Sequence, residues 1–256
     1  MDEEVYQKII SKKEFSDLPR ADVEAVYSRF DYSDSVEIEK IKSTRDLLRK
    51  MFSAFTSQKI LNLKDKDPEW ILKKHLSTKE RLPYYEEVYQ RLLSEYKTLT
   101  IFDLGAGING FSYDYFKKIG INVNYVATEA MGQLVSLMNN YFTKEKISGI
   151  AYPLSLFEKE KNVELIKKSK APSVVFLFKA LDSLEMLKRN YSKELLLAIT
   201  PLVDKVVVSF ATKSLVRRSK FKVQRIWLTT FLEENFKILD DFEIGGERYI
   251  SFKKEI

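Results

Sequence analysis

The sequence of 256 residues contains no cysteine and a single histidine, His75. Without cysteine the chain forms no disulfide bond, no thiolate zinc site and no cysteine nucleophile. One histidine argues equally against a histidine-ligated metal and a histidine-dependent catalytic triad. We therefore expect no metal site and no dedicated catalytic side chain. Any chemistry then depends on a cofactor, on carboxylates or lysines, or on positioning alone.

Long hydrophobic runs are also missing. No stretch approaches the ~18 uninterrupted apolar residues that span a bilayer, and residues 1–15 lack the basic start and apolar core of a signal peptide. We therefore expect a cytoplasmic, monomeric protein that does not enter membranes. The net charge of +6 favours a polyanionic partner such as RNA.

Glycine is scarce, with eight residues, yet three of them fall within Thr98–Gly110, which reads TLTIFDLGAGING. A β-prone apolar run ends at Asp103-Leu104, and helix-like sequence follows from Phe111 to Lys118. Glycines just after a strand let the backbone turn tightly and approach a ligand. The N-terminus of the next helix offers free N–H groups to a polar or anionic group. This stretch predicts a nucleotide-type cofactor site in an α/β fold.

Two cofactor classes compete for this site. Gly105, Gly107 and Gly110 match the G-x-G-x-x-G pattern of dinucleotide sites, and Glu129 follows at the distance of a ribose-binding acid. Asp103, however, precedes the first glycine by two residues, where a carboxylate attracts a cation and repels a pyrophosphate. This acid-x-Gly-x-Gly pattern resembles motif I of the class I S-adenosylmethionine-dependent methyltransferases. We favour a methyltransferase over a nicotinamide-dependent oxidoreductase, with a purely structural glycine turn as the third interpretation.

The chain divides into a helical part, residues 1–95, and an alternating part, residues 96–256. The expected strands are 98–104, 123–128, 173–178 and 205–210, the helical stretches between them are 111–119, 131–142, 157–168 and 184–198, and a terminal hairpin pairs 236–243 with 248–253. This alternation predicts an α/β, Rossmann-like methyltransferase fold, with a mainly parallel sheet, an antiparallel edge hairpin and a small N-terminal helical domain. Ligands of such sheets bind at the carboxyl ends of the strands.

Two helix starts are expected in the helical part. Ser43-Thr44 begins a strongly amphipathic helix, and Ser77-Thr78 with Glu80 forms a capping arrangement. Basic residues decorate the first of these helices: Lys42, Arg45, Arg49, Lys50 and Lys59. They form either a solvated helix face or a contact for RNA phosphates.

Two charged residues follow predicted strands. Glu129 ends the second strand, where a carboxylate can accept both hydroxyls of a ribose; otherwise it is a surface acid at a helix start. Lys179 follows the apolar run SVVFLF and is expected at the mouth of the cleft. There it would contact the substrate backbone or the cofactor carboxylate, or else reach solvent.

A third charged feature is the stretch 213–225, KSLVRRSKFKVQR, which has no acid. Its cations are Lys213, Arg217, Arg218, Lys220, Lys222 and Arg225. On a loop at the carboxyl edge of the sheet they would bind RNA phosphates, and Phe210, Phe221 or Trp227 could stack on an extruded base. The alternative is a solvated basic loop with Trp227 in the core.

Four motifs together carry a family resemblance: H-x-S-T-x-E-R at 75–81, DLGAGIN at 103–109, VVFLFKALDSLE at 174–185 and SFATKSL at 209–215. The chain resembles, over nearly its whole length, the ribosomal RNA guanine-N7 methyltransferases of aminoglycoside-producing and aminoglycoside-resistant bacteria. The resemblance implies an N-terminal helical domain that docks on the small ribosomal subunit and a domain that binds S-adenosylmethionine. By motif position, the resemblance implies that Arg81 and the loop Gly105, Ala106 and Gly107 contact the cofactor, that Glu129 holds its ribose, and that Lys179 and the 213–225 stretch face the RNA. We also expect Asp103 and Asn109 in the cofactor site and Trp227 on the RNA side.

The sequence departs from this family pattern in four places. Asn109-Gly110 stands for Asn-Pro, Leu181-Asp182 stands for Leu-Pro, residues 220–223 replace a glycine-rich stretch, and AYPLSL lacks the acid expected after the third strand, near the adenine. These changes leave the target nucleotide open. The alternatives are another RNA position, and a non-catalytic RNA-binding assembly factor.

The missing residues themselves bear on the reaction. A guanine N7 carries an unprotonated lone pair at neutral pH, so its methylation needs no general base. Methylation of cytosine C5 requires a cysteine nucleophile, which this chain lacks. Lys179-Ala180-Leu181-Asp182 also stands where adenine-N6 methyltransferases carry a (D/N)-P-P-(Y/F) motif. These absences are consistent with guanine-N7 methylation of small-subunit ribosomal RNA, the reaction that the resemblance implies.

Overall fold

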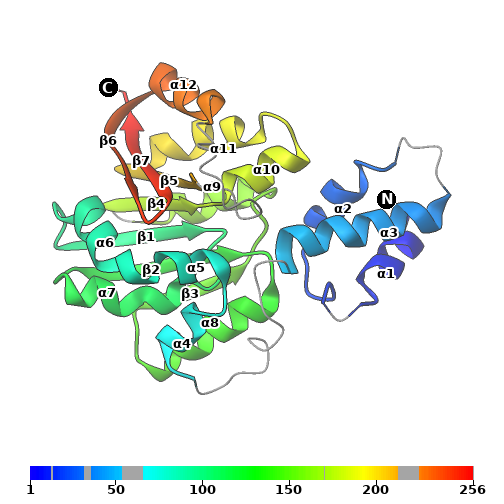
Figure 1. Ribbon diagram of the computed structural model, residues 1–256, viewed down its shortest axis with the longest axis horizontal. Helices are drawn as coiled ribbons and strands as arrows, with labels where there is room; N and C mark the ends of the chain where they lie inside the picture. Colours follow the sequence, from blue (N-terminus) through cyan, green and yellow to red (C-terminus); the bar gives the residue numbers. More distant parts are fainter. Residues whose placement is uncertain (13, 32–35, 54–65, 170, 213–224, 256) are drawn as a thin grey trace.

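Figure 1 shows the computed structural model, which describes residues 1–12, 14–31, 36–53, 66–169, 171–212 and 225–255. Within these ranges no helix is both long enough and apolar enough to cross a bilayer.

A seven-stranded sheet forms the centre of the structure. Its strands are β1 (Thr98–Leu104), β2 (Asn122–Glu129), β3 (Gly149–Pro153), β4 (Ser173–Phe178), β5 (Lys205–Ala211), β6 (Phe236–Ile244) and β7 (Glu247–Lys254). The spatial order is β3-β2-β1-β4-β5-β7-β6. The first five strands pair in parallel, and β7 runs antiparallel between β5 and β6. The expected Rossmann-like sheet with an antiparallel hairpin is confirmed.

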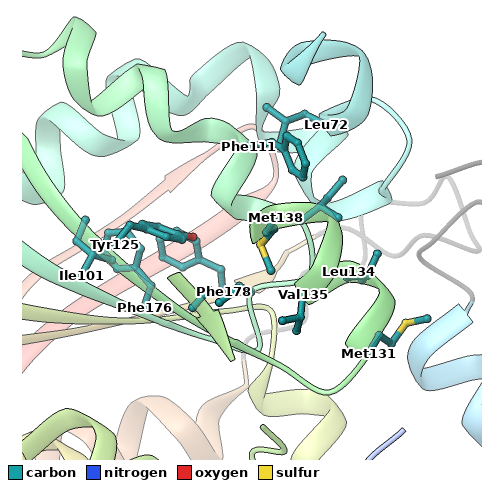
Figure 2. Packing of buried hydrophobic residues seen from close by; sticks show 14 of the residues in the cluster. Leu72, Ile101, Phe111, Tyr125, Met131, Leu134, Val135, Met138, Phe176 and Phe178 are labelled. Atoms are coloured by element: carbon teal, nitrogen blue, oxygen red, sulfur yellow. The ribbon is translucent and has the colours of Figure 1, made fainter. Parts of the chain in front are cut away.

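Helices cover both faces of this sheet (Figure 1). One face packs under α6 (Tyr85–Leu93), α7 (Tyr113–Lys118) and α8 (Gly132–Lys144), and the other under α9 (Lys159–Lys167), α10 (Leu181–Leu187), α11 (Tyr191–Ile199) and α12 (Ile226–Asn235). Figure 2 shows the first of these cores, with Val135 and Met138 of α8 turned toward the aromatic side chains of the sheet. Apolar burial on both faces explains why β4 is continuously hydrophobic.

Three elements differ from expectation. β3 was not among the expected strands, because it is short and its residues Ile150 and Tyr152 stay exposed at the sheet edge. The stretch 184–198 forms two helices, α10 and α11, because Asn190 between them adopts a left-handed backbone with a φ of 64°. No element was expected where α12 lies.

The N-terminal helices α1 (Glu3–Ile10), α2 (Arg20–Tyr27) and α3 (Glu37–Leu48) form a lobe beside the sheet, followed by the π-helix η1 (Arg49–Ser53) (Figure 1). We call residues 1–53 the N-terminal lobe. The next helices, α4 (Pro68–Leu72) and α5 (Leu76–Arg81), lead into the 3₁₀-helix η3 (Leu82–Tyr84) and α6. The domain boundary expected at residue 95 stays a prediction.

Both expected helix starts in this region are wrong. α3 begins at Glu37, and Thr44 lies in its interior, where its hydroxyl donates to the Lys40 carbonyl at 2.8 Å. At α5 the N-cap position belongs to His75, and the Thr78 hydroxyl donates to the Leu72 carbonyl at 2.6 Å. Ser and Thr hydroxyls that bond backwards to a carbonyl compete with the capping role that the sequence suggested.

Candidate cofactor-binding site

A cavity of about 400 Å³ opens at the carboxyl ends of β1, β2 and β4. Its walls come from the glycine loop after β1, the loop after β3, the first residues after β4, helix α5 and the N-terminal lobe. This volume lies within the range of small-molecule sites. The position at the strand ends is the one expected for ligands of open α/β sheets.

The glycine loop is held by the carboxylate of Glu129. The Gly107 N–H donates to Glu129 Oε2 at 2.8 Å, and the Met131 N–H donates to Oε1 at 2.9 Å. Gly105 and Gly107 have φ values of 71° and 57°, which a residue with a side chain rarely adopts. Glu129 is 8% exposed, and burial raises its pKa against the effect of these N–H donors.

Gly110, the third glycine of the G-x-G-x-x-G pattern, has a packing role. A Cβ atom there would lie 2.7 Å from the Phe142 ring of α8, so that only glycine fits. The third glycine of a dinucleotide fingerprint also has a packing role, so Gly110 does not separate the two cofactor classes.

Asp103 lies in a buried polar network beneath the cavity. It is 1% exposed and accepts hydrogen bonds from the Asn109 amide at 2.7 Å and from the Tyr125 hydroxyl. Burial raises the pKa of Asp103, although both hydrogen bonds oppose the shift. The Asn109 Oδ1 atom in turn accepts from Arg81 Nη1 at 3.0 Å and from the Tyr85 hydroxyl at 2.7 Å. Asn109 thus joins the carboxylate of Asp103 to the guanidinium of Arg81.

Each nitrogen of the Arg81 guanidinium donates to a residue far away in the sequence. Its Nη2 donates to Glu247 Oε1 at 2.6 Å and its Nε to the Tyr249 hydroxyl at 3.1 Å. Burial alone would raise the pKa of Glu247, but the Arg81 and Lys179 cations outweigh it and hold the pKa below its ordinary value. Arg81 lines the cavity while it also holds α5 against β7.

Lys179 lies at the cavity mouth, as the sequence suggested. Its backbone is left-handed, with a φ of 56°, and its Nζ lies 2.7 Å from Glu80 Oε2 and 3.3 Å from Glu247 Oε2. Sequence reasoning missed Glu80 as an ion-pair partner and missed Glu247 altogether. The available signal for Glu247 was an acid at the start of a strand that pairs with the largely apolar β5.

Acids outnumber bases among the charged residues that line the cavity. The acids are Asp22, Glu80, Asp103, Glu129 and Asp182, and the bases are Arg81, Lys179 and Arg225. Burial, reinforced by Arg81 and Lys179, lowers the pKa of the neighbouring His75 to about 4, so this side chain is neutral at pH 7. An excess of carboxylates suits a ligand with a positively charged centre and disfavours a pyrophosphate.

The predicted RNA-facing residues are only partly placed. Residues 213–224, which include Lys213, Arg217, Arg218, Lys220, Lys222 and Phe221, lie outside the described part of the chain. Arg225 lines the cavity, where its Nε donates to Asp182 Oδ1 at 2.6 Å and its Nη1 to the Ala211 carbonyl at 2.8 Å.

The aromatic residues expected to stack on a base lie mainly against the core. Phe210 is 2% exposed, with the Arg225 guanidinium 4.9 Å from its ring centroid, so its ring offers no free face to a base. Trp227 is half-buried and packs on the hydrophobic cluster under α12.

Two basic residues of α3 and η1, Arg45 and Arg49, make contacts inside the N-terminal lobe. The Arg45 guanidinium donates to the carbonyls of Lys8 and Ile9 at the end of α1. Arg49 pairs with Glu14 at 2.7 Å and Asp46 at 2.9 Å. Both arginines therefore make contacts within the lobe, but the Arg49 side chain stays 44% exposed. The choice between a solvated helix face and an RNA contact stays a prediction, and Lys59 lies outside the described residues.

The strand order and the cavity at the strand ends define the class of protein. A parallel sheet in which an antiparallel β7 inserts between β5 and β6 is the fold of the class I S-adenosylmethionine-dependent methyltransferases. Solved structures with this fold include the 16S rRNA methyltransferase RmtF in complex with S-adenosyl-L-homocysteine (TM-score 0.78, 20% identity, all of both chains). Another is the 16S rRNA methylase RmtB (TM-score 0.78, 19% identity, 98% of each chain).

Sequence comparison shows the family to which the chain belongs. The profile of the ribosomal RNA methyltransferase (FmrO) family matches residues 40–237, and the chain belongs to this family. A 16S rRNA (guanine(1405)-N(7))-methyltransferase of Micromonospora echinospora is 30% identical over 149 residues, which are 57% of this chain and 50% of that protein. The corresponding enzyme of Micromonospora rosea is 28% identical over the same length. The chain thus spans about half the length of the curated relatives it matches.

Proposed function

We propose that this protein transfers a methyl group from S-adenosylmethionine to a guanine N7 of small-subunit ribosomal RNA. The observation that carries the proposal is the acid-rich cavity at the strand ends, in a chain of the ribosomal RNA methyltransferase family. The guanine-N7 target rests on the Micromonospora relatives, which bear that activity. We further propose that the protein is a monomer that acts on the ribosomal subunit in the cytoplasm.

The residues of the cavity fit S-adenosylmethionine. This ligand carries an ammonium and a sulfonium against one carboxylate, and five acids face three bases in the lining. Glu129 would hold the ribose hydroxyls, since charge-assisted hydrogen bonds to a carboxylate are strong. Arg81, Asp103 and Asn109 would support the amino-acid end through the network that they share. Gly105, Ala106 and Gly107 would supply the backbone wall.

The chain's own contribution to the reaction is positioning. When bound, S-adenosylmethionine supplies an electrophilic methyl group on a positively charged sulfur. The N7 of guanine needs no deprotonation, so the protein has only to hold N7 in line with the methyl carbon. Such alignment supplies up to roughly 7–11 kcal/mol of the barrier in ideal cases. His75 stays neutral and buried, which agrees with a reaction that uses no histidine base.

The RNA would approach the cavity mouth between Lys179 and Arg225. Both side chains line the cavity and both are paired with acids, Glu80 and Asp182, that are more exposed than they are. A phosphate could exchange with these acids as partner of each cation. The basic stretch 213–224 lies next to Arg225 in sequence and would extend this phosphate-binding surface.

The proposal is tested with purified 30S subunits, free 16S rRNA and total tRNA, each incubated with methyl-labelled S-adenosylmethionine. Nucleoside mass spectrometry should find 7-methylguanosine in the 30S sample. A different methylated nucleoside would overturn the N7 assignment, and labelled tRNA would overturn the ribosomal target. Cofactor binding without transfer to any RNA would favour an assembly factor.

A further inference from the structure

The N-terminal lobe contributes a buried acid to the cofactor cavity. Asp22 lies in the first turn of α2, is 3% exposed and lines the cavity. Its Oδ2 atom is buried without a hydrogen-bond partner. A buried carboxylate oxygen without a donor is costly, so an unpaired oxygen on a residue that lines a cavity points to a donor group on a ligand.

Close packing fixes the position of Asp22. The lobe approaches α8 at Gly132, where an added Cβ would lie 3.3 Å from the Asp17 side chain. Met51 of the same lobe lines the cavity as well. Across the cavity wall, the buried Ser155 hydrogen bonds with the Asp22 side chain. Asp22 is therefore held by two elements, α2 and the loop after β3.

The surroundings of Asp22 differ from those at the other end of the cavity. The loop that carries Ser155 supplies Leu154, Leu156 and Phe157 to the lining. The amino-acid part of a cofactor needs the charged side chains that gather around Arg81 and Lys179. An apolar wall with one acceptor at its edge instead suits a flat heterocycle with an amino group.

We propose that Asp22 accepts a hydrogen bond from the exocyclic amino group of the cofactor's base, so that the N-terminal lobe reads the identity of that base. The inference rests on the proposed S-adenosylmethionine site. It assigns to α2 the acidic contact that the AYPLSL segment at the end of β3, residues 151–156, does not offer. Ser155 lies in that segment. It has no carboxylate, but it hydrogen bonds with the Asp22 side chain and so helps to position that carboxylate.

The test compares two ligands by calorimetry at pH 8, where Asp22 is ionised because burial raises its pKa only to about 7. The ligands are S-adenosylhomocysteine, and S-inosylhomocysteine, in which a carbonyl oxygen replaces the amino group. The wild-type protein should prefer the adenine ligand by about 100-fold, since a carbonyl facing a carboxylate is repelled. In Asp22→Asn the amide can donate to that carbonyl, so the preference should fall to about threefold or less. Asp17→Asn, an exposed change in the same lobe, is the matched control and should keep the wild-type preference.

Each outcome is decisive. Equal wild-type affinities for the two ligands overturn the inference even if the variant does not fold. An unchanged preference in a folded Asp22→Asn protein overturns it as well. If the wild-type protein binds neither ligand, the S-adenosylmethionine site itself is refuted, which is the failure of the proposed function.

Discussion

Replacing Asp22 by asparagine should stabilise the protein at alkaline pH, although it impairs the site. Burial raises the pKa of Asp22 from its ordinary 3.8 to about 7, against the Ser155 hydrogen bond and with help from Glu129 and Glu158. The folded protein therefore holds the Asp22 proton more tightly than the unfolded chain does. The contribution of Asp22 to the free energy of unfolding is therefore largest below pH ~3.8, and it is lost as the pH rises through ~7.

The magnitude follows from the shift. One pKa unit corresponds to about 1.4 kcal/mol. Asp22 therefore lowers the free energy of unfolding of the wild-type protein by about 3 kcal/mol as the pH rises from 5 to 8. The asparagine amide does not titrate, so the variant loses none of this free energy as the pH rises. The difference in unfolding free energy between Asp22→Asn and wild type should therefore shift by about 3 kcal/mol in favour of the variant over this range.

Urea unfolding at pH 5, 6, 7 and 8, followed by circular dichroism, measures this difference, and groups common to both proteins cancel. A constant difference for Asp22→Asn would refute the reasoning, because Asp22 would then be ionised throughout.

Three further predictions concern other parts of the site. Glu129→Gln should weaken S-adenosylhomocysteine binding at least tenfold, about 1.4 kcal/mol, because the charge-assisted hydrogen bonds are lost. The exposed Glu164→Gln is the control in the same calorimetric measurement. Equal affinities of Glu129→Gln and the wild-type protein for this ligand would remove Glu129 from the site. His75, whose resonance is unique in a chain with one histidine, should stay neutral from pH 8 to pH 5.5 by NMR, because burial lowers its pKa to about 4; a midpoint near 6.5 would show an open pocket. Arg217→Glu with Arg218→Glu should abolish methyl transfer to RNA and leave cofactor affinity intact, since phosphate contacts depend on charge; wild-type rates would place the RNA elsewhere.

The sheet could be predicted from sequence because its signals are local. β1 and β4 begin and end at the expected residues, since each is an apolar run bounded by turn residues. Glu129 and the glycine loop were likewise predictable, because strand-end positions follow from the strands themselves. Residue spacing within one βαβ unit is enough to bring them together.

The polar network could not be predicted in this way, because its partners are distant in the sequence. Arg81 and Glu247 are 166 residues apart, and no local pattern specifies that α5 packs on the first residue of β7. Asp22 could not be predicted as a cavity residue for a different reason. An acid in the first turn of a helix already has an ordinary explanation in the helix dipole, so its sequence position gave no sign of a cavity.

This network also limits how Arg81 can be interpreted. Family resemblance assigns Arg81 to the cofactor, yet its donors already reach Asn109, Tyr249 and Glu247 within the protein. Removing the guanidinium would leave the buried Glu247 with Lys179 as its remaining cationic partner among the described residues, and breaking a buried pair costs about 3–5 kcal/mol. Loss of activity in an Arg81 variant would therefore report the fold as well as the site. Glu129 lines the cavity and its carboxylate accepts from the backbone N–H groups of Gly107 and Met131, so a Glu129 variant separates these two effects more cleanly.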